Sequence, residues 1–148
     1  MRHIDTAKWQ DELIHQLYQT MRAFGKTLNS SISPTGIYGS EWTILNLVRR
    51  HDGIAQADII NLLGVEPAAV SKTVSKLEQK GIVRREQQQG TRGKAVFLTE
   101  KARDLCAPLE QAVAAHRQQA LAGLSQEECE NLRQLMARIE QNVLHSNQ

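Results

Sequence analysis

The chain has 148 residues, of which 41% are hydrophobic, enough to fill the interior of one domain or of two small lobes that share a core. Two cysteines can form at most one disulfide bond. No apolar run approaches the ~20 residues of a membrane span, and the first ten residues lack the apolar core of a signal peptide. These features exclude a secreted disulfide scaffold and an integral membrane protein, and we expect a soluble, cytoplasmic protein.

The net charge of +2 hides an uneven distribution of charge along the chain. Between Glu66 and Leu98, seven basic residues stand against three acidic ones, so this segment carries +4 while the remainder carries −2. Such segregation indicates an anionic partner for the segment, although a charged face that meets only solvent would have the same composition.

The N-terminal third of the chain predicts two helices separated by a loop. Apolar residues recur every three or four positions from Trp9 to Leu28, which is helical spacing. Residues 29–36 contain Ser, Pro and Gly and predict a loop. Ser40 is a suitable N-cap for a second helix, and Asp52-Gly53 predicts where that helix ends.

Two short helices follow, joined by a tight turn. Residues 57–63 are apolar on one side, and Gly64 stops this helix. Pro67 is suited to the first position of the next helix, whose buried stripe is predicted to be Val70, Val74 and Leu77. The remaining surface of that second helix is small and basic.

Two strands are predicted at residues 82–86 and 94–98, joined by a polar tip that contains two glycines, which is typical of a hairpin. Thr99 can cap a long helix that carries Leu105, Leu109, Val113 and Leu121 and in which Pro108 should cause a kink. Ser125 and Glu128 form a capping box for the last amphipathic helix.

The order of these elements predicts a mainly α fold with a small β-wing, namely a winged helix-turn-helix. A helix with small residues on its outer face fits the major groove of DNA, which is ~12 Å wide, and a basic hairpin tip can enter the minor groove. Lysine and arginine contacts to phosphates would supply affinity and salt dependence. The residues predicted to contact DNA are Pro67, Ala68, Ser71, Lys72, Ser75, Lys76, Arg85, Arg92 and Lys94. A winged helix that binds another protein is the alternative.

The chain resembles the MarR family of bacterial transcriptional regulators across nearly its whole length. The segments that carry the resemblance are residues 56–65 (QADIINLLGV), 70–72 (VSK), 77–85 (LEQKGIVRR) and 97–101 (FLTEK). The family's wing usually carries an Asp-x-Arg motif, and Arg92 matches its arginine. Gly90 stands in the place of the aspartate, and Ala55 stands where a capping Ser or Thr is common.

The resemblance implies a two-fold dimer that binds a pseudo-palindromic operator. We expect residues 1–38 and 100–148 to form a helical dimerisation region and residues 39–99 to form the DNA-binding region. Apolar residues on the terminal helices support this independently, because the small DNA-binding region cannot cover them all. The residues predicted at the dimer interface are Trp9, Leu13, Leu132, Leu135, Met136, Ile139 and Val143.

The resemblance also implies a repressor that releases DNA when a small aromatic or phenolic molecule binds. Tyr18, Arg22, Tyr38 and Trp42 are candidates for lining such a cleft, and the alternative is that they are core and hinge residues.

Other kinds of site have little support in the sequence. The histidines are scattered and there is no CxxC, so we expect no metal and no cofactor. The chain lacks the phosphate-binding loop, GxSxG and HExxH motifs, so we expect no catalytic residues and no enzyme. Cys106 and Cys129 lie in helical patterns and are expected to be inert, with a redox-gated or metal-gated regulator as the alternative.

Overall fold

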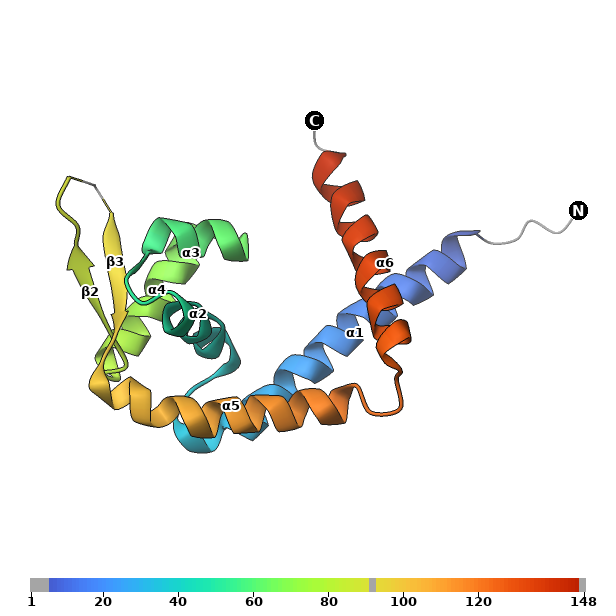
Figure 1. The fold of residues 1–148 in the computed structure, drawn as a ribbon. Helices are drawn as coiled ribbons and strands as arrows, with labels where there is room; N and C mark the ends of the chain where they lie inside the picture. Colours follow the sequence, from blue (N-terminus) through green and yellow to red (C-terminus); the bar gives the residue numbers. More distant parts are fainter. Residues whose placement is uncertain (1–5, 91–92, 147–148) are drawn as a thin grey trace, which may run out of the picture. The chain divides into compact units, whose positions relative to one another are not determined.

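The computed structural model describes residues 6–90 and 93–146. The chain divides into two compact units, Met1–Ala114 and Ala115–Gln148. Unit 1 contains, in order, α1 (Thr6–Ile32), a short 3-10 turn η1 (Ser33–Thr35), α2 (Gly39–Arg50), β1 (Ile54–Ala55), α3 (Gln56–Leu63), α4 (Pro67–Gln79), β2 (Val83–Gln87), β3 (Lys94–Leu98) and most of α5 (Glu100–Ala120). Unit 2 contains the end of α5 and α6 (Gln126–His145). The predicted fold class, mainly α with a small β-wing, is confirmed (Figure 1).

The first helix is longer than its sequence pattern predicts. The loop predicted for residues 29–36 is wrong over its first part, because α1 continues to Ile32. The hydroxyls of Ser30 and Ser31 donate to the carbonyl oxygens of Lys26 and Thr27 one turn earlier, so these polar residues bond within the helix instead of ending it. Ile32 is fully buried, which fixes this last turn against the core.

The second helix begins before Ser40, the predicted N-cap. Tyr38 occupies the N-cap, and its backbone N–H donates to Oε1 of Glu41 at 3.0 Å. The backbone N–H of Gly39 is bonded by the side chain of Asn29 on α1. The cap prediction failed because a tertiary contact and a carboxylate at the third helical position satisfy the free N–H groups that a serine was expected to satisfy.

The helix-turn-helix matches its prediction. Gly64 ends α3 with a positive φ of 62°, and Pro67 opens α4. Ala55 precedes α3 without a capping side chain, as the sequence indicates. The core beneath these helices consists mainly of aliphatic side chains from α1, α2, α3, α4, α5, β2 and β3, together with Trp42.

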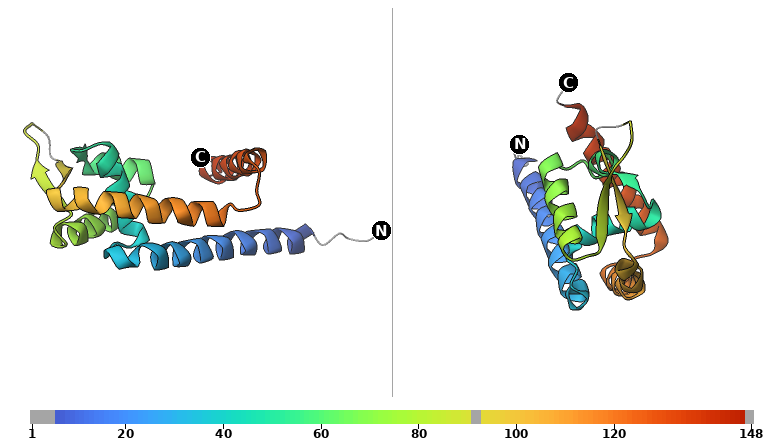
Figure 2. Two further views of the ribbon diagram at one scale, coloured as in Figure 1. Left: turned by 60° about the horizontal axis from the view of Figure 1, so that its bottom comes forward. Right: turned by 90° about the vertical axis from the view of Figure 1, so that its left-hand side faces the viewer.

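The sheet has three antiparallel strands in the order β1-β3-β2, one more than predicted. β1 has only two residues, too few for an alternating pattern, and pairs Ile54 with Val96. Gly53 before it has a φ of +89°, and an added Cβ would lie 2.8 Å from the Phe97 ring, so only glycine fits there. The β2–β3 hairpin and α4 lie at the same end of unit 1 (Figure 2).

The C-terminal helices are capped as predicted, with one boundary corrected. The Thr99 hydroxyl accepts from the backbone N–H of Ala102, and Ser125 and Glu128 exchange two hydrogen bonds of 3.1 Å. α5 continues past Pro108 to Ala120, so Leu121, predicted to lie on this helix, belongs to the following turn. The kink at Pro108 stays a prediction. No described helix is long and apolar enough to cross a membrane.

Candidate nucleic-acid interface

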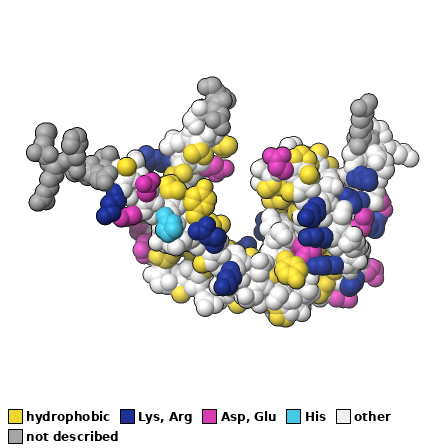
Figure 3. All heavy atoms as spheres, turned by 180° about the vertical axis from the view of Figure 1, so that it is seen from behind, with side chains coloured by type: hydrophobic (Ala, Val, Ile, Leu, Met, Phe, Trp, Pro, Cys, Tyr) yellow, Lys and Arg dark blue, Asp and Glu magenta, His cyan; other side chains and the backbone are white. Residues whose placement is uncertain are grey.

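The outer face of α4 is small, basic and open to solvent. Val70, Val74 and Leu77 are buried on the inner face and hold the helix on the core. On the outer face Pro67, Ala68, Lys72 and Lys76 are exposed, while Ser71 and Ser75 are half-buried at the flank. Lys72 and Lys76 make no ion pair within the described part of the chain. Lys and Arg side chains gather over residues 39–98, which we call the head (Figure 3).

Arg85 joins β2 to α4. Its Nη2 donates to Oγ of Ser75 at 2.7 Å and to Oε1 of Glu78 at 3.1 Å, and its backbone N–H donates to Oε2 of Glu78. The Arg85 side chain is only 14% exposed. The hydrogen bond from Arg85 lowers the pKa of the Glu78 carboxyl below its usual value. The fold therefore brings the predicted residues Ser75 and Arg85 together and partly neutralises the arginine.

The wing presents further cations beside the head. Arg84 pairs with Glu86, and its guanidinium lies 4.7 Å from the centre of the Phe97 ring. Lys94 is exposed at the start of β3. Arg92, the predicted minor-groove residue, lies outside the described residues. Gly90 has a φ of +79°, a conformation that glycine adopts without steric cost, so glycine suits this turn of the wing.

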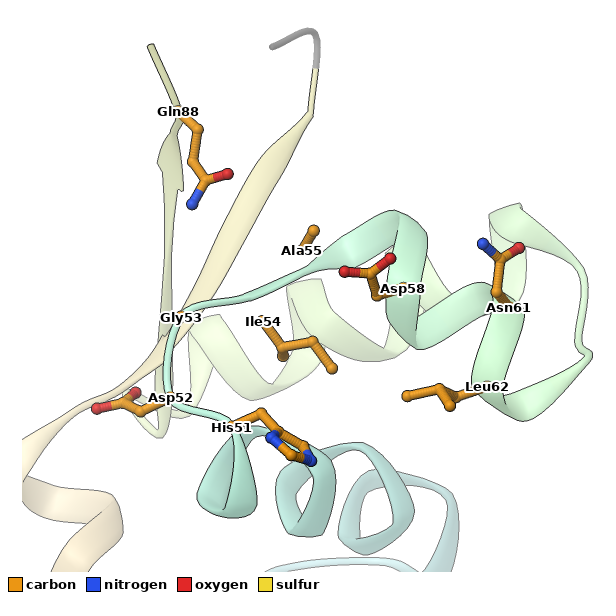
Figure 4. Close-up of a pocket in the computed structure, with 9 residues that line it drawn as sticks. All are labelled: His51, Asp52, Gly53, Ile54, Ala55, Asp58, Asn61, Leu62 and Gln88. Carbon is orange, nitrogen blue, oxygen red and sulfur yellow. The ribbon is translucent and has the colours of Figure 1, made fainter. Parts of the chain in front are cut away.

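Two grooves of the head were not anticipated from the sequence. One, of about 770 Å³, lies beside β1 and α3 (Figure 4). Asp52 and Asp58 line it, which disfavours an anion, and Asn61 and Gln88 add amides. A second groove, of about 330 Å³, lies between α2, α4 and the turn joining α3 to α4. Neither groove was visible in the sequence, because residues 51–55 and α3 meet Gln88 of the wing, and α2 meets α4, only after folding.

The four residues predicted to line a ligand cleft lie in different surroundings. Tyr18 is exposed on α1 and Tyr38 is exposed at the start of α2. Arg22 is exposed on α1 as well. Trp42 is only 5% exposed and belongs to the core. None of the four lines either groove.

The residues predicted for the dimer interface are all exposed within their own units. Trp9 and Leu13 lie on α1 in unit 1. The α6 residues in unit 2 are Leu132, Leu135, Met136, Ile139 and Val143. None of the residues of α6 is buried, so the apolar face of this helix is not covered within its own unit. Exposed apolar stripes of this kind mark surfaces that bind another protein.

The two cysteines and the possible metal ligands were considered as sites for redox or metal regulation. Cys106 and Cys129 are free and half-buried, and burial raises the pKa of the Cys106 thiol, which lowers its reactivity. Among the described residues no cluster of three or more His, Cys, Asp or Glu side chains could hold a metal ion.

Comparison with known proteins agrees with this geometry. A family model described as MarR family matches residues 35–92, the segment from the end of η1 past β2, which stops before β3. The uncharacterized HTH-type transcriptional regulator YwoH of Bacillus subtilis (strain 168) is 38% identical over 90 residues, 61% of this chain. The chain is therefore similar to MarR-family regulators over its helix-turn-helix and first wing strand. The match to YwoH spans 66% of that protein's length, just under two thirds.

Solved structures of MarR-family regulators share the fold of this chain. A mutant MarR from E. coli, complexed with operator DNA, has a TM-score of 0.82 and 23% identity, covering 91% of this chain and 98% of its own. CouR from Rhodococcus jostii RHA1, bound to p-coumaroyl-CoA, has a TM-score of 0.76 and 22% identity, covering 88% of this chain and 92% of its own.

Proposed function

We propose that this chain is a homodimeric, sequence-specific DNA-binding transcriptional regulator of the MarR family that acts in the cytoplasm. The observation that carries the proposal is the outer face of α4, where exposed Lys72 and Lys76 flank small residues on a helix anchored by a buried stripe. Such a face can enter the major groove without steric conflict. The operator DNA bound by the similar E. coli MarR supports double-stranded DNA as the partner.

The proposed contacts divide into those that select sequence and those that supply affinity. Pro67, Ala68, Ser71 and Ser75 approach base edges. Lys72, Lys76 and Lys94 bind phosphates, which carry no sequence information but make binding depend on salt. Arg92 reaches into the minor groove. Arg85 has a further task, because its bonds to Ser75 and Glu78 hold the wing beside α4.

The proposed dimer joins the apolar faces of α1 and α6 with those of a second copy. A second copy is the occupant that fits best, because a two-fold pair of heads matches a pseudo-palindromic operator with half-sites one turn apart, ~34 Å. Trp9, Leu135 and Met136 are among the exposed apolar residues that this would bury.

Regulation is proposed to be repression relieved by a small aromatic or phenolic molecule. The p-coumaroyl-CoA bound by the similar CouR supports an organic effector. Tyr18, Arg22 and Tyr38 are exposed and can meet a ligand directly. Trp42 lies in the core, so its participation requires the α2 region to shift when the ligand binds.

Fluorescence anisotropy with duplexes selected by the protein from a randomised library tests DNA binding. We expect nanomolar affinity, with unrelated DNA bound at least ~10³-fold more weakly. The variant Lys72→Gln/Lys76→Gln should weaken binding to both kinds of duplex and lower the slope of log affinity against log salt by about 4, since each protomer of the dimer loses two phosphate contacts. Lys26→Gln, an exposed position on α1, is the matched control and should leave both unchanged.

Two results would contradict the proposal. One is that the wild-type protein selects no duplex even at low salt, which would favour a winged helix that binds another protein. The other is an unchanged salt slope in the double variant, because the face of α4 would then not meet phosphates.

A further inference from the structure

The end of α4 carries a lysine that is not part of the exposed face. Lys80 caps α4, and its Nζ lies 2.7 Å from Oε1 of Glu41, 39 positions earlier in the chain. Glu41 is 2% exposed, whereas the Lys80 side chain is 34% exposed, so the ion pair joins a buried carboxylate to a cation at the edge of the core. Charge counting assigned Lys80 to the basic segment, whereas the fold turns it inward.

The partners of the Lys80 ammonium all belong to one short segment. Besides Glu41, Nζ donates to the carbonyl oxygen of Gly36 at 2.9 Å and lies 4.9 Å from the centre of the Tyr38 ring. Residues 36–41 connect η1, which follows α1, to the start of α2. An ammonium has three N–H donors. With a carboxylate, a carbonyl and an aromatic face already around it, Lys80 has little capacity left for a phosphate.

The ion pair is incompletely satisfied. Oε1 of Glu41 accepts from both Lys80 and the backbone N–H of Tyr38, whereas Oε2 is buried without a partner in the described structure. Buried pairs of this kind contribute little net stability, because desolvation offsets their attraction, and some serve to specify one arrangement. The ion pair therefore serves better to fix the position of α4 against residues 36–41 than to stabilise the fold.

The backbone at the same point is held from another side. Nζ of Lys101, on α5, donates to the carbonyl oxygen of Lys80 at 2.9 Å. The C-terminal end of α4 is thus tied by its side chain to residues 36–41 and by its backbone to α5. Ser71 lies nine residues before Lys80, which is ~13.5 Å along a helix, so tilting α4 by ~10° about this end would move Ser71 by ~2 Å. Hydrogen bonds to base edges tolerate far less.

We propose that Lys80 is a positioning residue for DNA recognition, which through Glu41 couples the segment leaving α1 to the tilt of α4 and touches no DNA. This inference rests on the proposed function. Loss of the pair should therefore reduce discrimination between DNA sequences and spare the sequence-independent attraction to phosphates. A true phosphate contact would lose both together.

The test compares variants on a selected duplex and an unrelated duplex across a salt series. Lys76→Met, one helical turn earlier and exposed, is the matched control; it should weaken binding to both duplexes alike and lower the salt slope by about 2, one contact for each protomer of the dimer. Lys80→Met should weaken the selected duplex at least ~10-fold while leaving the unrelated duplex and the salt slope unchanged. Lys80→Arg, which retains the cation, should retain most of the discrimination.

A double variant separates positioning from folding. Glu41→Met/Lys80→Met removes the unpaired buried charge, so its melting temperature should recover relative to Lys80→Met, yet discrimination should stay low. Wild-type discrimination in the double variant, or a lower salt slope in Lys80→Met, would overturn the inference. A wild-type protein that selects no duplex would instead defeat the proposed function, and the inference would fall with it.

Discussion

Arg85 and Glu78 illustrate how single residues change their role when the fold assembles. In the sequence both are charged residues in a basic segment. In the structure Arg85 is largely buried between β2 and α4, and Glu78 accepts from its guanidinium and from its backbone N–H. Charge-assisted hydrogen bonds therefore attach β2 to α4, and such bonds are stronger than hydrogen bonds between neutral groups.

The ion pair between Arg85 and Glu78 should make the stability of the protein depend on pH. Because the folded-state pKa of Glu78 lies below its unfolded value, the contribution to stability is present above the unfolded pKa, ~4.3, and is lost as pH falls through the folded value. We expect Glu78→Gln to be less stable than wild type at pH 7 by at most ~1 kcal/mol, since the carboxylate is partly exposed, with the gap closing below pH ~4. Thermal unfolding between pH 3 and pH 7 measures this. A gap that widens toward low pH would contradict the assignment.

At the scale of elements, a helix boundary can be predicted from the sequence where the residues that cap it lie close together in the chain. The capping box at Ser125 was predicted because both partners lie within four residues. The starts and ends near residues 29–41 were mispredicted, because Asn29 caps Gly39 and the buried Ile32 extends α1. Composition alone indicated a loop there, and packing overrode it.

Pro108 should reduce the stability of α5. It is exposed inside α5, where it lacks the N–H that would bond one turn back. Pro108→Ala should raise the free energy of unfolding by ~1–3 kcal/mol, since alanine restores that bond and no packing is lost. Urea denaturation measures the change, with exposed Ala107→Gly as a helix control that should destabilise by about 1 kcal/mol. A destabilised Pro108→Ala protein would mean that a bend at this position is required by the fold.

At the scale of the whole molecule, the apolar surfaces outside the head need a partner. α6 exposes a row of large apolar side chains and buries none of its residues within its own unit. α1 exposes a comparable row in its own unit. Surfaces of this size are unfavourable in water, which is the physical reason for proposing a second copy of the chain.

A substitution on α6 tests this dimer. Leu135→Glu places a charge at a residue that is 53% exposed in the single chain and proposed to be buried by the second copy, so sedimentation velocity should show a monomer. Leu121→Glu, at a turn residue that is 47% exposed and outside the proposed interface, should remain dimeric. Monomeric wild-type protein at micromolar concentration, or a dimeric Leu135→Glu variant, would contradict the proposal.

The sequence by itself determined the features that depend on neighbours along the chain. Helical periodicity, glycine stops and capping residues predicted α3, α4, β2 and β3, which form the winged helix-turn-helix, and also α6. The same patterns identified which face of α4 is buried, because Val70, Val74 and Leu77 recur at helical spacing.

Only the tertiary structure decided the features that depend on residues distant in the chain. β1 exists because β3 supplies its hydrogen bonds, and two residues carry no periodic signal of their own. Arg85 was predicted to contact DNA and Lys80 was counted in the basic segment, but Glu41, Gly36, Ser75 and Glu78 meet them only after folding. Local patterns report which face of an element is apolar, whereas the partner of a charge depends on how the elements pack, and that information is not periodic.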